Sequence, residues 1–112
     1  MESTRQSKVS RLIQKDLGEF FQRESGSYFN GVIITVTIVR VTKDLGIARI
    51  YLSFFPDKDR EIILKHITNS TKYIRHQLGT RIRNRVRIIP ELEFYLDDSI
   101  EYLENIERLL KK

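Results

Sequence analysis

The N-terminal segment carries hydrophobic residues at the spacing of an amphipathic helix. Over residues 3–24 they recur three or four positions apart, as Val9, Leu12, Ile13, Leu17, Phe20 and Phe21. This period gathers them on one helix face, which we expect to pack on the core. The glycine- and serine-containing stretch 25–31 predicts a loop. Three cations form a stripe away from the apolar face, and this stripe suits either a solvated face or a polyanion-binding surface: Lys8, Arg11 and Lys15.

The middle of the chain predicts an antiparallel hairpin. Residues 34–41 are rich in β-branched side chains, and residues 47–54 alternate between apolar and polar side chains. The short stretch 43–46 (KDLG) supplies the turn between them. One face of the hairpin should be buried, which leaves Arg49 and Tyr51 on the other. Arg beside an aromatic ring can stack on a base, although an ordinary exposed strand face explains the pair more simply.

The next segment predicts two helices that meet at a break. Asp57 is a good N-cap residue for the first helix. Asn69, Ser70 and Thr71 are poor helix formers in succession, so we expect a kink near Ser70. Gly79 is expected to end or bend the second helix. The buried stripe along both helices should consist of Ile63, Ile67, Ser70, Ile74 and Leu78.

The C-terminal part predicts a strand and a closing helix. Within residues 81–94 the hydrophobic period changes from helical towards two, and Pro90 borders the strand. Residues 97–99 (DDS) supply an N-cap and an acidic first turn, after which residues 100–110 are amphipathic. The predicted order is therefore α-β-β-α-α-β-α, within a single domain that spans residues 1–112.

Charge is strongly segregated along the second half of the chain. Residues 72–87 contain no acid and six cations: Lys72, Arg75, Arg81, Arg83, Arg85 and Arg87. Residues 88–107 contain no cation and seven acids: Glu91, Glu93, Asp97, Asp98, Glu101, Glu104 and Glu107. Exposed charges add little to stability, so this segregation points to two surfaces of opposite sign. With a net charge of +5, the positive one predicts a polyanionic partner.

The sequence contains no recognisable catalytic, metal or cofactor site. There is no cysteine, and the two histidines, His66 and His76, lack a third ligand that could complete a zinc site. No phosphate-binding glycine loop and no nucleophile–base pair is present, so we expect neither an enzyme nor a bound cofactor. The N-terminus lacks the apolar core of a secretory signal, and no apolar run is long enough to span a membrane. We therefore expect a cytoplasmic domain.

Four motifs in order resemble ribosome-binding factor A. They are RQSKVSRLIQKDLGEFFQRE, VTKDLGIARIYLSF, YIRHQLGTRI and RIIPELEFYLD, and the resemblance runs from about Thr4 to Leu110. The α-β-β-α-α-β order is that of a type II KH domain. The resemblance implies an α+β, type II KH-like RNA-binding domain in which helices cover a three-stranded sheet. RNA-gripping KH domains clamp the backbone with a GxxG loop, whereas this family has an Ala-x-Gly kink.

The kink falls on Ser70-Thr71-Lys72, where this chain departs from the family at both ends. Ser70 replaces Ala and remains small, but Lys72 replaces Gly and would be costly if that position needed a positive φ. Either the kink is milder in this chain, or Thr71 and Lys72 form it by another geometry. Lys72 also adds a cation where RNA would approach.

The resemblance implies a bacterial factor that binds the free small (30S) ribosomal subunit. Such a protein supports the processing and folding of 16S rRNA, matters especially in the cold, and is not an enzyme. The implied partners are the 30S subunit and its 16S rRNA, with ribosomal proteins or an assembly GTPase as further candidates. We expect no membrane association and a monomer.

Two sets of cations are the predicted RNA contacts. The first set lies on the kinked helices and beyond, and comprises Lys72, Arg75, Arg81, Arg83 and Arg85; the second comprises Lys8, Arg11 and Lys15. Arg87 is placed to pair with Glu91 or Glu93. We expect reversal of Arg81 and Arg83 to Glu to abolish ribosomal RNA binding while leaving thermal stability nearly unchanged. Two alternatives are a module whose acidic face binds a basic protein, and a KH-like module that binds DNA away from the ribosome.

Overall fold

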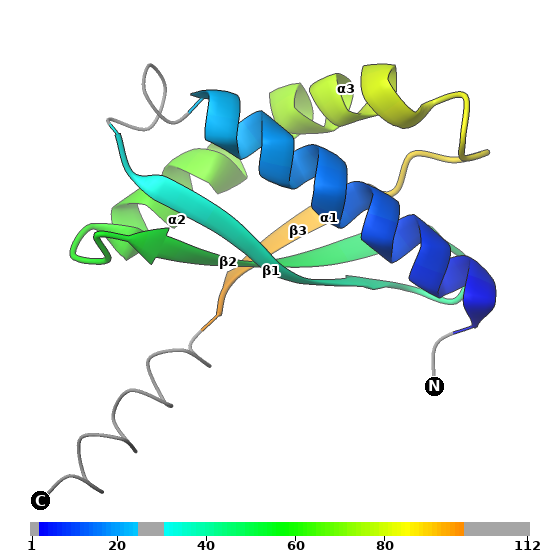
Figure 1. The fold of residues 1–112 in the computed structure, drawn as a ribbon, viewed down its shortest axis with the longest axis horizontal. Helices are drawn as coiled ribbons and strands as arrows, with labels where there is room; N and C mark the ends of the chain where they lie inside the picture. The colour runs from blue at the N-terminus through cyan, green and yellow to red at the C-terminus, as the bar shows by residue number, and fades with distance from the viewer. Residues whose placement is uncertain (1–2, 25–30, 98–112) are drawn as a thin grey trace, which may run out of the picture.

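The computed structural model describes residues 3–24 and 31–97 and has an α+β architecture (Figure 1). The elements are α1 (Thr4–Glu24), β1 (Ile33–Val41), β2 (Ile47–Phe55), α2 (Arg60–Asn69), α3 (Thr71–Ile82) and β3 (Glu91–Leu96). This order agrees with the prediction for every element that the structure describes. The predicted loop 25–31, except for Gly31, and the closing helix over 100–110 lie outside the described residues.

The three strands form one sheet in the order β1-β2-β3. β1 and β2 are antiparallel, as the hairpin prediction required, and β2 and β3 are parallel. Parallel neighbours need a long crossover connection, which α2 and α3 supply. Figure 1 shows the helices over one face of the sheet. The loop between α3 and β3 lies at the same end of the molecule as the β1–β2 turn and the start of α1.

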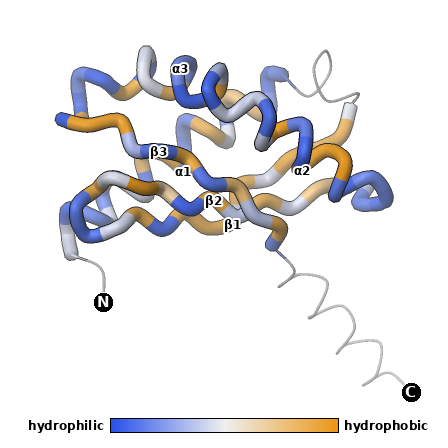
Figure 2. The backbone as a smooth tube through the Cα atoms, turned by 180° about the vertical axis from the view of Figure 1, so that it is seen from behind, coloured by the Kyte–Doolittle hydropathy of each residue, from blue (hydrophilic) through white to orange (hydrophobic). Residues whose placement is uncertain are grey.

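The core lies between the sheet and the helices. Hydrophobic segments run along the strands, whereas much of α3 is hydrophilic (Figure 2). Burial of a large aliphatic or aromatic side chain stabilises the fold by about 1.5–3 kcal/mol relative to exposure. The fully buried large side chains are Phe21, Ile13, Leu17, Ile50, Leu52, Ile67, Ile74, Leu78, Ile82 and Pro90.

The break between α2 and α3 occurs at Ser70, as predicted. Ser70 has φ −99° and ψ 10°, while Thr71 and Lys72 are the first two residues of α3. Among the described residues, φ is positive only at Leu45 and Gly31. Lys72 therefore needs none of the conformational freedom of glycine, and a single non-helical serine carries the kink in this chain.

Two local predictions were wrong. Asp57 is not the N-cap: the Arg60 backbone N–H donates to its carbonyl, so a turn precedes α2 and Asp59 takes the cap position. Gly79 does not end α3, which runs on to Ile82, because burial of Ile82 favours one further turn and Ile89 packs over the glycine. Pro90 borders the strand as predicted, since β3 begins at Glu91.

Candidate nucleic-acid interface

Three segments that are distant in sequence line one cleft of about 520 Å³. They are the first turns of α1, the β1–β2 turn and the loop between α3 and β3. We call this hollow the basic cleft, because five cations line it together with one acid, Asp44. The cations are Arg5, Lys8, Lys43, Arg85 and Arg87.

A capping box fixes the start of α1 beside the hairpin. The Ser3 backbone N–H donates to Gln6 Oε1 at 2.8 Å, and the Gln6 backbone N–H donates to Ser3 Oγ at 3.1 Å. This reciprocal pair satisfies backbone donors at the helix start. Gln6 Nε2 also donates to the carbonyl of Val41 at 2.9 Å, where β1 ends. The first turns of α1, which carry Arg5 and Lys8, are thereby held against the turn that carries Lys43.

Asp44, the one acid among the described residues that line the cleft, shapes that turn. Asp44 Oδ1 accepts a hydrogen bond from Thr42 Oγ1 at 2.7 Å and another from the Gly46 backbone N–H at 3.0 Å. These two bonds, the one from Thr42 first, lower the pKa of the Asp44 carboxyl below its ordinary value. Leu45, which lies between Asp44 and Gly46, adopts a left-handed φ of 62°. Asp44 therefore stabilises the turn and pairs with none of the cleft cations.

The five cations of the basic cleft lack ion-pair partners within residues 3–24 and 31–97. Arg5 and Lys8 lie near the N-terminus of α1, which has no acid in its first turn. Cations are unfavourable there, because the helix dipole places partial positive charge at that end. Mutual repulsion adds to this cost, so the arrangement does not serve stability and instead favours an anionic ligand.

A second hollow continues the positive surface along α3. It has a volume of about 560 Å³ and is lined by Lys72, Arg75, His76, Gly79, Thr80, Arg83, Ile88 and Ile89. We call it the α3 groove. Ile88 also lines the basic cleft, so the two hollows adjoin at the loop between α3 and β3. Together they form one basic surface.

Arg75 holds the loop that separates the two hollows. Its Nε donates to the carbonyl of Pro90 at 2.9 Å and its Nη2 donates to the carbonyl of Ile89 at 2.6 Å. The guanidinium also lies 3.7 Å from the carboxylate of Glu91. Arg75 therefore positions the loop, and its charge is only partly available to a ligand.

Comparison with known proteins agrees with this picture. The family model for ribosome-binding factor A matches residues 5–110. The ribosome-binding factor A of Cytophaga hutchinsonii is 47% identical over 112 residues, which cover 100% of this chain and 84% of the relative. The chain belongs to the ribosome-binding factor A family. The resemblance identified in the sequence is thus confirmed.

Solved structures of ribosome-binding factor A show the same KH-like fold. The crystal structure of the Thermus thermophilus protein has a TM-score of 0.68 at 23% identity and covers 81% of this chain and 94% of that one. A Thermus thermophilus homology model, fitted into the cryo-EM map of a 30S complex, has a TM-score of 0.60 at 22% identity. It covers 88% of this chain and 97% of the other. The type II KH-like prediction is confirmed.

In this member of the ribosome-binding factor A family, the Arg81 side chain forms ion pairs with acids of α1. Its Nε lies 3.1 Å from Oδ1 of Asp16 on α1, and Glu19 contacts the same guanidinium. Arg81 lines neither hollow of the basic surface. Its charge is matched by two carboxylates, so the structure gives it a role between α1 and α3.

The predicted stripe on α1 divides between two hollows. Lys8 lines the basic cleft, whereas Lys15 lines a separate hollow of about 570 Å³ between α1 and β1, which also contains Glu19. Arg11 is exposed on α1 and lines neither of them. Of the first predicted set, Lys72 and Arg83 are exposed in the α3 groove and Arg85 in the basic cleft.

Sequence reasoning missed three members of the basic cleft: Arg5, Lys43 and Arg87. Arg5 and Lys43 are isolated cations at a helix start and in a hairpin turn, and nothing local shows that these places meet. The S-x-x-Q pattern at Ser3–Gln6 was the available signal for the capping box. Arg87 was expected to pair with Glu91 or Glu93, but in the described structure these acids pair with Arg75 and Arg49.

On the face of the sheet opposite the helices, charged side chains pair with one another. Arg49 Nε lies 3.4 Å from Oε1 of Glu93, and Tyr51 stacks on Tyr95 with ring centroids 5.4 Å apart. The Tyr95 hydroxyl donates to Glu93 at 2.7 Å, and this bond raises the pKa of the tyrosine. Arg49 and Tyr51 thus lie on the outer face as predicted, but this face carries no excess of positive charge. The rest of the predicted acidic surface lies outside the described residues, except Asp97.

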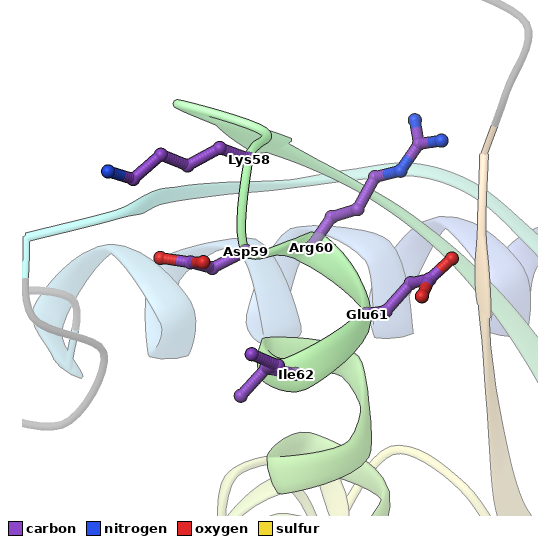
Figure 3. A pocket seen from close by; sticks show the side chains of 5 residues that line it. All are labelled: Lys58, Asp59, Arg60, Glu61 and Ile62. Carbon is purple, nitrogen blue, oxygen red and sulfur yellow. The ribbon is translucent and has the colours of Figure 1, made fainter.

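A hollow at the start of α2 lacks the excess of cations that characterises the basic cleft. It measures about 310 Å³ and is lined by two cations, two acids and one apolar residue, whose side chains point in different directions (Figure 3). They are Lys58, Asp59, Arg60, Glu61 and Ile62. In the part of the chain that the structure describes, no group of acids and histidines could hold a metal ion. Nor does any described helix have the length and apolar character needed to cross a membrane.

Proposed function

We propose that this chain is a ribosome-binding factor that associates with the free 30S subunit and promotes the maturation and processing of its 16S rRNA. It acts as a cytoplasmic monomer without catalysis, and its contribution is greatest in the cold. Membership of the ribosome-binding factor A family supports this proposal, as does the 30S complex of the Thermus thermophilus protein. The observation that carries it is the basic cleft, where unpaired cations from three segments converge.

Binding rests on neutralisation of RNA phosphates. Cations of the basic cleft and of the α3 groove contact the backbone and release its counterions, which gives affinity without reading sequence. Lys8, Arg85, Lys72 and Arg83 serve this role in the proposal, and Arg5, Lys43 and Arg87 join them. Arg75 positions the loop between the hollows. Arg11 and Lys15 extend the positive surface along α1, while Arg81 stays with its carboxylate partners.

Sucrose-gradient sedimentation of a cell extract tests the function. We expect the chain to migrate with free small subunits and not with assembled ribosomes. A variant in which Lys8, Arg85 and Arg87 are replaced by Gln should move to the top of the gradient. The matched control replaces three exposed cations outside both hollows, Arg40, Lys58 and Lys65, by Gln and should migrate like the parent protein.

Two results would contradict the proposal. Migration of the parent protein only at the top of the gradient at low salt would remove the ribosomal function. The KH-like fold would remain, and DNA or a basic protein would become the better candidate for the partner. Equal loss of co-migration in the variant and in its control would instead assign binding to net charge and not to the basic surface.

A further inference from the structure

Four apolar residues line the basic cleft together with its cations. Val9 is buried, Leu45 and Val86 are partly buried against the core, and Ile88 is 58% exposed at the junction with the α3 groove. A surface that meets only the phosphates of a duplex needs cations but no apolar recess, because those contacts are polar and lie on the outside of the helix. The apolar residues of the lining therefore point to a ligand with an apolar part.

The cleft has the size and composition of a pocket for one nucleotide. Its volume of about 520 Å³ falls in the range of small-molecule pockets, about 300–1,000 Å³, which combine apolar walls with a few polar groups. A base that is paired and stacked within an A-form helix cannot enter such a recess. Bases in loops, bulges and ends are free to be splayed out into protein pockets.

We infer that the basic cleft takes one unpaired nucleotide of RNA. Its base lies against Leu45, Val86 and Ile88, and the phosphates on either side of it meet cations of the rim, including Lys43 and Arg85. This inference rests on the proposed function, since it specifies which form of RNA the same surface recognises. The α3 groove, which adjoins the cleft at Ile88, provides the path along which the strand continues.

The geometry of the hairpin turn supports this assignment. The hydrogen bonds of Asp44 with Thr42 and Gly46 hold Leu45 in a left-handed conformation, so its side chain is fixed at the cleft before a ligand arrives. Arg75 likewise fixes the loop that carries Val86 and Ile88 through its bonds to the carbonyls of Ile89 and Pro90. A preorganised pocket binds with little ordering cost.

The test compares a single-stranded RNA of about ten nucleotides, without self-complementarity, with a blunt duplex of the same length. Fluorescence anisotropy at one salt concentration should show tighter binding of the single strand. Ile88→Ala should weaken single-strand binding about three- to tenfold through lost apolar contact and leave duplex binding unchanged. Ile62→Ala is the matched control, because Ile62 is 71% exposed on α2, outside the cleft. It should change neither affinity.

A second measurement separates a nucleotide from a phosphate alone. In methyl NMR spectra, adenosine 5′-monophosphate should shift the signals of Leu45, Val86 and Ile88, and inorganic phosphate should not. Equal affinity for single strand and duplex, with no effect of Ile88→Ala, would overturn the inference and leave the proposed function standing. Identical methyl shifts with both small ligands would also overturn it. Failure to bind either RNA would overturn the inference, whereas the sedimentation experiment decides the proposed function separately.

Discussion

Arg81 on α3 and Asp16 on α1 form an ion pair that joins two helices over the sheet. Arg81 Nε lies 3.1 Å from Asp16 Oδ1, and the two side chains are 26% and 14% exposed. Glu19, one helical turn further along α1, contacts the same guanidinium. The pair is thus shielded from water, unlike the cations of the basic cleft, and its role is structural.

Arg81→Glu should therefore destabilise the fold, against our expectation from the sequence. The new carboxylate would face Asp16 and Glu19, and removal of the guanidinium would leave Asp16 without its partner. We expect a loss of about 1–3 kcal/mol, between the values for exposed and buried pairs. Urea unfolding measures this. Arg83→Glu, at the exposed C-cap of α3, is the control: it should cost only about 0.3–1 kcal/mol through the helix dipole while weakening RNA binding.

Lys72→Gly should not improve the kink between α2 and α3. Lys72 is the second residue of α3 and has a negative φ, so glycine would add chain entropy to the unfolded state without relieving strain. We expect a loss of roughly 0.5–1 kcal/mol relative to Lys72→Ala, measured by chemical denaturation. Both variants lack the ammonium group, so RNA affinity should fall equally in the two. Greater stability of the glycine variant would mean that position 72 favours a positive φ after all.

The sequence predicted the presence of each helix and strand better than where each one begins and ends. Hydrophobic period, together with β-branched content and the run of poor helix formers at 69–71, identified every described helix and strand, because each buries one face against the same core. The predicted ends of the helices were less accurate. Asp57 and Gly79 are residue types that favour caps and breaks, but the surrounding structure overrode that preference. The turn before α2 displaced the first, and burial of Ile82 with packing of Ile89 over Gly79 overrode the second.

The candidate site was predictable only in part for the same reason. Arg83 and Arg85 belong to a conspicuous run of cations, and counting charge was enough to find them. Counting could not separate Arg81, which carboxylates of α1 neutralise, from its neighbours. It also could not bring Arg5 and Lys43 together, because their proximity depends on how α1 packs on the hairpin.

The salt dependence of RNA binding should report the number of cleft cations in contact with phosphates. Replacing Lys8, Arg85 and Arg87 by Gln should reduce the slope of log K against log salt by about 2–3, since each lost contact removes about 0.7–0.9. Anisotropy titrations at several salt concentrations measure the slope. The Arg40, Lys58 and Lys65 control carries the same net charge and should retain the parental slope. An equal reduction of the slope in both variants would show that the cleft cations make no specific contacts with phosphates.

Acid should weaken the β1–β2 turn through Asp44. The hydrogen bonds from Thr42 and Gly46 lower the pKa of Asp44 in the folded state below its ordinary value of 3.8. The stabilisation is therefore fully present above that ordinary value and is lost as the pH falls through the lower folded pKa. Asp44→Asn keeps an oxygen acceptor for both donors but cannot titrate. Urea midpoints measured from about pH 6 to about pH 2 should show an advantage of the parent protein that disappears in acid.

The same substitution separates the turn from the charge of the cleft. At neutral pH, Asp44→Asn removes the one acid that lines the basic cleft among the described residues, so RNA affinity should rise even though the turn is less stable. Asp59→Asn, at an exposed residue whose side chain makes no cap hydrogen bond, controls for the loss of one carboxylate and should leave RNA affinity unchanged. A stability difference between parent and Asp44→Asn that stays constant across the acid range would contradict the role of the ionised carboxylate. Unchanged affinity would contradict the placement of Asp44 at the RNA-binding cleft.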